Sequence, residues 1–138
     1  MVSWAAVAER LAKARNYWIV TSRAGGRAHA SPVWGLWLDG RFWFSTDPTS
    51  VKGRDIATNP RTVVHLESGD EVVILEGVAE KPTPHDPALS RFVELYEEKY
   101  GFHLDVAKPS FGIYMVSPSA AYAWFEKNFA DSATRWLF

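Results

Sequence analysis

Hydroxyl and cationic side chains cluster in the segment between Ser45 and Arg54. Ser45 and Thr46 end the run RFWFST, and Ser50, Lys52 and Arg54 follow in SVKGRDIATNP. Ser50 suits the N-cap of a short helix, whose first turn presents unpaired amides and the positive end of the helix dipole. Lysine adds a point charge, and arginine can grip two phosphate oxygens. The segment therefore predicts an anion site, although a capped surface helix with solvated cations explains the same residues.

Two strand-turn-strand units must position these side chains. Asp-Gly between two apolar runs is the strongest short hairpin signal, and Asn-Pro is a typical helix end. The elements expected here are a strand over Ala28–Leu38, a turn at Asp39-Gly40, a strand over Arg41–Thr46, a helix from Ser50 to Thr58, and strands over Thr62–Glu67 and Val72–Glu80. The predicted anion site thus lies where one strand ends and one helix begins.

The rest of the chain completes a mainly β (α+β) fold. Further elements are a helix capped by Ser3, a helix that starts at Asp86-Pro87 and closes at Gly101, and strands over Tyr17–Ser22, Phe111–Ser117 and Ala120–Phe125. The tail NFADSATRWLF gives no clear pattern. Six to seven strands with hairpin links predict an antiparallel sheet curled into a small barrel with peripheral helices, formed by residues 1–138 as one domain.

Composition excludes several classes of protein. The chain has no cysteine, so disulfides and thiolate-metal sites are absent, and its four histidines show no metal-ligand spacing. No run approaches the roughly 18 apolar residues of a membrane span, and no signal peptide is evident, so we expect a soluble, cytoplasmic protein. A net charge of −1 gives no field toward nucleic acid. This argues against a barrel that binds single strands through its aromatic side chains.

Aromatic residues are unusually common, with seven tryptophans among 138 residues. Such side chains are enriched in pockets for flat ligands and at subunit interfaces. In the strand through Val33 and Trp34, both faces are apolar: Gly35 and Trp37 alternate with Leu36 and Leu38. One face can point into the barrel, and the other then needs cover. We therefore expect a homodimer.

Motifs for residue-based catalysis are missing. His29 and Ser31 share one strand face, but no third group or nucleophile-elbow pattern accompanies them, so a polar lining role or bonding to backbone explains them better. His65 is more simply a satisfied strand histidine. Gly25-Gly26 is a turn, because no dinucleotide or P-loop pattern follows it. Chemistry supplied by a bound cofactor fits such a chain, since the protein then contributes binding and orientation.

With these residues in view, the chain resembles the pyridoxamine 5′-phosphate oxidase-like split β-barrel family, and within it the flavin- and deazaflavin-dependent oxidoreductases. The resemblance spans nearly the whole chain and is strongest in HASPVWGLWLDGRFWFST, SVKGRDIATNPRTVVHLESGDEVVILEG and ATRWLF. It implies a split barrel that forms a homodimer with two equivalent cofactor sites, each at the subunit interface. Where many oxidase relatives carry a basic residue before the matched Lys52, this chain has Ser50 and Val51.

The resemblance also assigns roles to particular residues. It implies that Ser31, Pro32, Val33 and Trp34 run along the cofactor ring, and that Ser45, Thr46, Ser50 and Lys52 hold its phosphate, with Arg54 beside them. It places Trp124, Arg135 and Trp136 of the partner chain over the site. The motifs PVWGLW and TRW favour coenzyme F420 over FMN. Residues typical of pyridoxal-phosphate recognition are not evident, which argues against authentic pyridoxamine 5′-phosphate oxidase activity.

The resulting hypothesis is an F420- or FMN-dependent oxidoreductase that transfers a hydride to a small organic substrate. The same residues would serve a non-catalytic protein that binds or carries the cofactor. No catalytic side chain is predicted.

Overall fold

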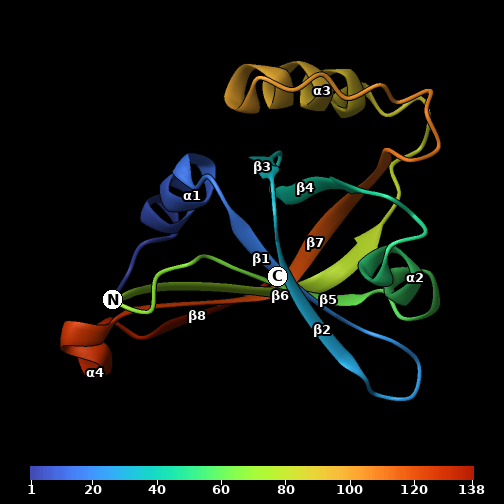
Figure 1. Cartoon of the computed structure of the whole chain (residues 1–138). Coiled ribbons are helices and arrows are strands. Elements are labelled where there is room, and N and C mark those ends of the chain that lie inside the picture. Colours follow the sequence, from blue (N-terminus) through green and yellow to red (C-terminus); the bar gives the residue numbers. More distant parts are fainter.

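The structure is a computed structural model that describes residues 1–138. It contains eight strands, four α-helices and one 3-10 turn (Figure 1). The strands are β1 (Tyr17–Ser22), β2 (Ala28–Val33), β3 (Gly35–Leu38), β4 (Arg41–Thr46), β5 (Arg61–His65), β6 (Glu71–Glu80), β7 (Gly112–Phe125) and β8 (Thr134–Leu137). The helices are α1 (Trp4–Lys13), α2 (Val51–Thr58), α3 (Pro87–Tyr100) and α4 (Phe129–Ser132), and the 3-10 turn is η1 (Glu126–Asn128).

Seven strands form one curled antiparallel path in the order β2-β1-β5-β6-β7-β4-β3, and β8 pairs with β7 beside it. The helices lie outside this sheet, with α3 running beside β3 and β4 and α2 near the far end of β1 (Figure 1). The prediction of a six- to seven-stranded antiparallel split barrel with peripheral helices is confirmed, with β8 as a short addition. None of the helices combines the length and apolar character needed to cross a bilayer.

The prediction of one long strand over Ala28–Leu38 is wrong, because the chain changes its pairing partner at Trp34. Up to Val33 it pairs with β1 as β2, and from Gly35 it pairs with β4 as β3. The local sign of this corner is Gly35, since a glycine inside a strand pattern often marks a bend or a close approach of backbone. A Cβ atom at Gly35 would lie 2.5 Å from the Trp43 carbonyl oxygen, so this corner requires a glycine.

The two strands expected over Phe111–Ser117 and Ala120–Phe125 are one continuous strand, β7. Opposite β6, Gly77 pairs with Pro118 while Glu76 pairs with Ala120, which leaves Ser119 as the extra residue of a bulge. A bulge is where a proline fits inside a sheet, because the missing amide hydrogen is not needed there. The tail, for which no element was predicted, forms α4 and β8, and β8 depends on pairing with β7.

Apolar side chains pack on both sides of β4. Phe42 and Phe44 belong to the core inside the curled sheet, with Tyr17, Ile19, Val64 and Leu75. Trp43 belongs to a second cluster under α3, where it stacks on Phe92 at 5.6 Å. On α3, Phe92 and Tyr96 are buried in this second cluster. Because α3 packs on β3 and β4, its C-terminal end lies next to the corner at Trp34.

Candidate functional site

A cleft of about 380 Å³ lies where β4 ends and α2 begins, beside the corner between β2 and β3. It is lined by Asn16, Pro32, Val33, Trp34, Ser45, Thr46, Lys52 and Tyr96. Six residues predicted from the sequence therefore meet in one place: Pro32, Val33, Trp34, Ser45, Thr46 and Lys52. They come from β2, the corner, β4 and α2, and the hairpin and the helix cap that were predicted are what bring them together.

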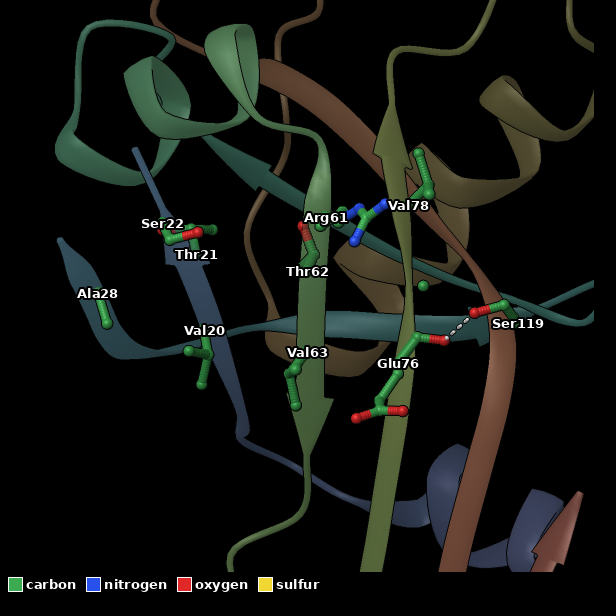
Figure 2. Close-up of a pocket in the computed structure, with 11 residues that line it drawn as sticks. Val20, Thr21, Ser22, Ala28, Arg61, Thr62, Val63, Glu76, Val78 and Ser119 are labelled. Carbon is green, nitrogen blue, oxygen red and sulfur yellow. Dashed lines mark hydrogen bonds between the residues drawn. The ribbon is translucent and has the colours of Figure 1, made fainter. Parts of the chain in front are cut away.

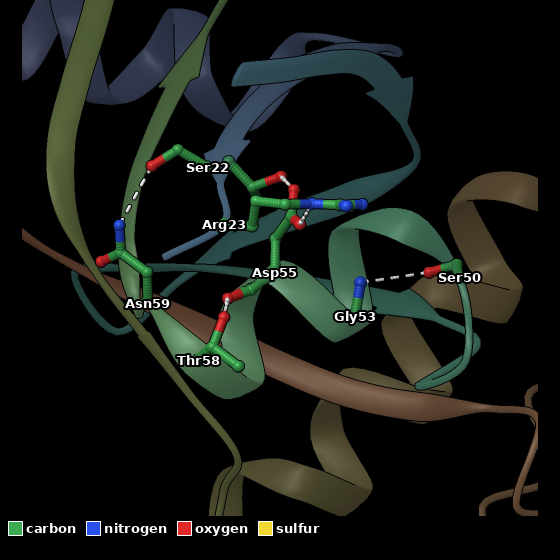
Figure 3. A network of polar contacts seen from close by, with 8 residues as sticks. Ser22, Arg23, Ser50, Gly53, Asp55, Thr58 and Asn59 are labelled. Atoms are coloured by element: carbon green, nitrogen blue, oxygen red, sulfur yellow. Dashed lines mark hydrogen bonds and ion pairs between the residues drawn. The ribbon is translucent and has the colours of Figure 1, made fainter. Parts of the chain in front are cut away.

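Ser50 caps α2 as predicted. Its hydroxyl accepts a hydrogen bond of 3.2 Å from the Gly53 amide (Figure 3). The same hydroxyl oxygen lies 3.1 Å from the Thr46 hydroxyl oxygen. The helix start packs tightly against the preceding turn, because a Cβ at Gly53 would lie 2.7 Å from the Asp47 and Pro48 carbonyl oxygens. The first amides of α2 thus lie beside the hydroxyls that end β4, an arrangement suited to an anion.

A buried polar network fixes α2 against β1. The Asp55 carboxylate accepts 2.9 Å from the Thr21 hydroxyl and lies 3.7 Å from the Arg23 side chain, while Asn59 donates 3.0 Å to the Ser22 hydroxyl (Figure 3). Asp55 is only 2% exposed. The sequence analysis did not single out Asp55 or Thr21. The sequence feature that could have identified Asp55 is its position in the middle of a short helix, next to the apolar Ile56.

The two cations of α2 differ in position. Neither Lys52 nor Arg54 has a carboxylate within 4.0 Å. Lys52 is half-buried and lines the cleft, whereas Arg54 is exposed and does not. A cation without a carboxylate partner beside a helix start favours an anion. The structure therefore supports Lys52 as the charge in the site and gives Arg54 no contact there.

Aromatic rings form the opposite wall of the cleft. The Trp34 indole stacks on Tyr100 with ring centroids 4.6 Å apart and planes 5° apart, and Tyr96 lies beside both rings. Burial raises the pKa of Tyr96 to about 12, so its phenol stays protonated at neutral pH. Asn16 and Tyr96 were missed as cleft residues, because they are far from the predicted segment in sequence.

A second hollow of about 270 Å³ adjoins the cleft and shares Trp34, Ser45, Thr46 and Tyr96 with it. Its other residues are Asp47, Phe102, Leu104, Ser110 and Phe111. Hydrogen bonds from the amide and the hydroxyl of Thr49 lower the pKa of Asp47. The hollow is therefore mainly aromatic, with one ionised carboxylate at its edge.

Four predicted residues lie away from the cleft of their own chain. Ser31 is on the inner face of β2, where its hydroxyl oxygen is buried without a hydrogen bond, as is His29 Nδ1. Trp124 packs on Phe129 at 5.5 Å, Trp136 packs on Trp4 at 5.3 Å, and Arg135 is exposed on β8. Since the last three are expected to act from a partner chain, their role stays a prediction.

Two histidine interpretations can be compared with the structure. His65 Nδ1 lies 2.8 Å from the Leu66 carbonyl oxygen and its ring stacks on Trp18, so it is a satisfied strand histidine as predicted. His29 and Ser31 form no hydrogen bond with each other. Bonding of this pair to backbone is therefore not observed, and nothing prepares the serine as a nucleophile.

A hollow of about 550 Å³ lies on the outer face of the sheet over β1, β5 and β6 (Figure 2). Val20, Val63 and Val78 contribute an apolar floor, and Arg61 and Glu76 are the charged residues in it. Val78 is 45% exposed. The sequence pattern of a strand that is apolar on both sides lies elsewhere, on β3, where Leu36 and Leu38 are buried under α3 and Trp37 packs on the core inside the sheet.

Comparisons with known proteins agree with this fold. A family model described as pyridoxamine 5′-phosphate oxidase matches residues 3–125. No curated protein sequence matches the chain.

Several solved structures share the fold. A conserved hypothetical protein from Mycobacterium tuberculosis has a TM-score of 0.76 and 26% identity, covering 94% of this chain and 89% of its own. A structure described as an F420 reductase has a TM-score of 0.64 and 22% identity, covering 82% of this chain and 94% of its own. HutZ, a heme storage protein from Vibrio cholerae, has a TM-score of 0.69 and 13% identity, covering 86% of this chain and 91% of its own.

Proposed function

Because the chain belongs to the pyridoxamine 5′-phosphate oxidase family, we propose that it binds coenzyme F420, or alternatively FMN, in the cleft beside Trp34. We further propose that it uses this cofactor to transfer a hydride to a small organic substrate. The observation that carries the proposal is the pairing, in one cleft, of a hydroxyl- and cation-lined end with an aromatic wall. A cofactor with a flat ring and a phosphate matches this cleft, because the ring can pack on the aromatic wall while the phosphate binds at the polar end.

At the polar end of the cleft, the protein is proposed to bind the cofactor phosphate. Thr46 and Ser45 supply hydroxyl donors, and Lys52 supplies the positive charge. The start of α2 adds the backbone amides of Val51 and Lys52, since the Gly53 amide already donates to the Ser50 hydroxyl. Arg54 is a weaker candidate, because its side chain lies outside the cleft.

At the aromatic end, Pro32, Val33 and Trp34 provide the surface on which the ring packs. A bound deazaflavin or flavin supplies the two-electron chemistry itself. The side chains of the cleft bind the cofactor and orient it. The titratable groups that line the cleft are Lys52 and the phenol of Tyr96, whose pKa is raised. The adjoining aromatic hollow is the expected location of the acceptor.

The fold does not choose between cofactors. At 22% and 13% identity, the F420 reductase and the heme storage protein share only their architecture with this chain. The preference for F420 rests on the resemblance of PVWGLW and TRW to the deazaflavin-dependent branch.

We propose that the active form is a homodimer. The support is the outer face of β1, β5 and β6, where exposed Val78 and a large hollow leave apolar surface without cover. Arg61 and Glu76 give this face both signs of charge, as a self-complementary two-fold interface needs. In such a dimer, Trp124, Arg135 and Trp136 of one chain are expected near the cleft of the other.

A non-catalytic carrier or storage protein for the cofactor is the alternative function. It is favoured by the lining of the cleft, which includes no histidine, aspartate or glutamate that could move a proton to the acceptor. Binding by the same residues serves both functions, so only turnover distinguishes them.

The test begins with separate fluorescence titrations of the purified protein with F420 and with FMN. Micromolar or tighter binding of one cofactor identifies it, and reoxidation of that reduced cofactor by a panel of quinones and enones then tests for turnover. Tight binding without turnover supports the carrier function. Failure of both cofactors to bind overturns the proposal.

A further inference from the structure

Trp34 lies at the corner where the chain leaves β1 and joins β4, between two strands rather than within one. Its indole lines both the cleft and the adjoining hollow. A bulky side chain outside a strand has no cross-strand neighbour to hold it. Its orientation must therefore come from other parts of the protein.

The last turn of α3 supplies these contacts. Tyr100 stacks flat on the Trp34 indole at 4.6 Å. Its hydroxyl accepts 3.0 Å from the Gly35 amide and lies 2.9 Å from the Gly35 carbonyl oxygen and 2.7 Å from the Arg15 carbonyl oxygen. One tyrosine thus contacts both the ring of Trp34 and the backbone immediately after it.

Lys99, the preceding residue, reinforces the same corner. Its ammonium donates 3.1 Å to the Gly35 carbonyl oxygen and 2.9 Å to the Tyr17 hydroxyl, which in turn donates 2.6 Å to the Leu11 carbonyl oxygen. It also lies 5.1 Å from the Tyr100 ring centroid. The corner is therefore tied to β1 and to the end of α1, as well as to α3.

We propose that Tyr100 and Lys99 are positioning residues that act from outside the cleft and hold the Trp34 indole in place as its aromatic wall. Neither residue lines the cleft, so neither touches the ligand. For its effect on ligand affinity, the inference rests on the proposed function, namely that F420 or FMN packs on Trp34. The effect on Trp34 itself is independent of any ligand.

Two features make the contact specific to this corner. A side chain at position 35 would collide with Phe42 and with the Trp43 carbonyl. Residue 35 must therefore be glycine, and it offers no side chain of its own that could fix the corner. Gly101 follows Tyr100 with φ of 69°, the left-handed conformation that ends a helix, so α3 stops where its last ring meets Trp34. Loss of an aromatic pair of this kind changes an equilibrium constant, such as the dissociation constant of a ligand, by a few-fold to about tenfold.

The first experiment follows Trp34 without a cofactor. Protein labelled with 5-fluorotryptophan gives one fluorine NMR resonance per tryptophan, and Trp34→Phe assigns the resonance of Trp34. We expect Tyr100→Leu and Lys99→Met to shift or broaden that resonance, and Glu98→Gln, an exposed neighbour on α3, to leave it unchanged. Tyr100→Phe, which keeps the ring, should cause a smaller change than Tyr100→Leu. An unchanged Trp34 resonance in the folded Tyr100→Leu protein overturns the proposal.

The second experiment is a double-mutant cycle on the dissociation constant of the cofactor that binds. Tyr100→Leu should weaken binding by about fivefold to tenfold in the wild-type background, and should have little effect in the Trp34→Leu background. A general loss of structure would instead weaken both backgrounds equally, which would contradict a positioning role. If Tyr100→Leu does not fold, Tyr100→Phe and Lys99→Met replace it in the same double-mutant cycle with Trp34→Leu.

The two proposals fail differently. If neither F420 nor FMN binds to the wild-type protein, the proposed function fails, while the fluorine resonance still decides whether Tyr100 positions Trp34. If a cofactor binds and the cycle shows no coupling, the positioning role fails and the proposed function stands.

Discussion

The hydroxyl of Thr21 on β1 donates a hydrogen bond of 2.9 Å to the carboxylate of Asp55 on α2, and both residues are buried. This bond fixes the helix whose first turn carries Ser50 and Lys52. Because α2 is only eight residues long, its placement depends on such tertiary contacts rather than on its intrinsic helix stability. Asp55, which does not line the cleft itself, therefore controls the geometry of the proposed phosphate site.

Asp55→Ala should lower the free energy of unfolding by about 1–3 kcal/mol, since it leaves the buried Thr21 hydroxyl without its acceptor. Urea denaturation measures the change, and Asp131→Ala, at an exposed carboxylate, is the control. Thr21→Val should add little once Asp55 has been replaced. Fully additive effects of the two substitutions would show that the observed bond carries no coupling.

Lys52→Ala should weaken binding of F420 or FMN by about 1.5–3 kcal/mol, the range of a hydrogen bond to a charged group. Stability should change little, because Lys52 has no carboxylate partner to lose. Titration by fluorescence quenching gives the affinity, with Lys127→Ala as a control at an exposed cation. Unchanged affinity in Lys52→Ala would remove Lys52 from the site.

Val78→Arg should convert the proposed homodimer into monomers, because it places a charge on the exposed apolar face of β6. Leu95→Arg on α3 is a matched control, since Leu95 is 38% exposed and lies away from that face. Light scattering after gel filtration gives the mass of each variant. A dimer that survives Val78→Arg would place the interface elsewhere.

Stability should depend on pH through Lys99. Burial, and secondarily the Arg15 guanidinium, lower the pKa of its ammonium from 10.5 to about 8. Between these values the unfolded chain binds more protons than the folded protein, so the free energy of unfolding should rise with pH from about 8 toward 10. Above pH 10 the raised pKa values of Tyr17 and Tyr96 act in the opposite direction, since there the folded protein binds more protons.

Urea denaturation at several values between pH 7 and 10, on wild type and Lys99→Met, isolates this contribution. The difference between the two profiles should grow across the window in favour of the wild type. Parallel profiles would mean that Lys99 keeps an ordinary pKa in the folded protein.

The hairpin at Asp39-Gly40 and the cap at Ser50 were predictable because each depends on a few adjacent residues. Asp39 and Gly40 both adopt positive φ, as an Asp-Gly hairpin requires, and Ser50 bonds a residue only three positions away. Together they place Ser45, Thr46 and Lys52 in one cleft, so most of the predicted anion site follows from local chemistry. The bulge at Ser119 escaped prediction because it is defined by register against a strand more than 40 residues away.

By itself, the sequence determined most of the helices and strands, the hairpin at Asp39-Gly40, and the residues that end β4 and begin α2, since all of these depend on short-range periodicity and capping. Only the tertiary structure decided that the chain bends at Trp34, that Tyr96 and Asn16 join the cleft, and that Tyr100 supports the indole. These contacts join residues up to 80 positions apart. No local pattern encodes them, because they arise when the sheet curls and α3 packs across β3 and β4.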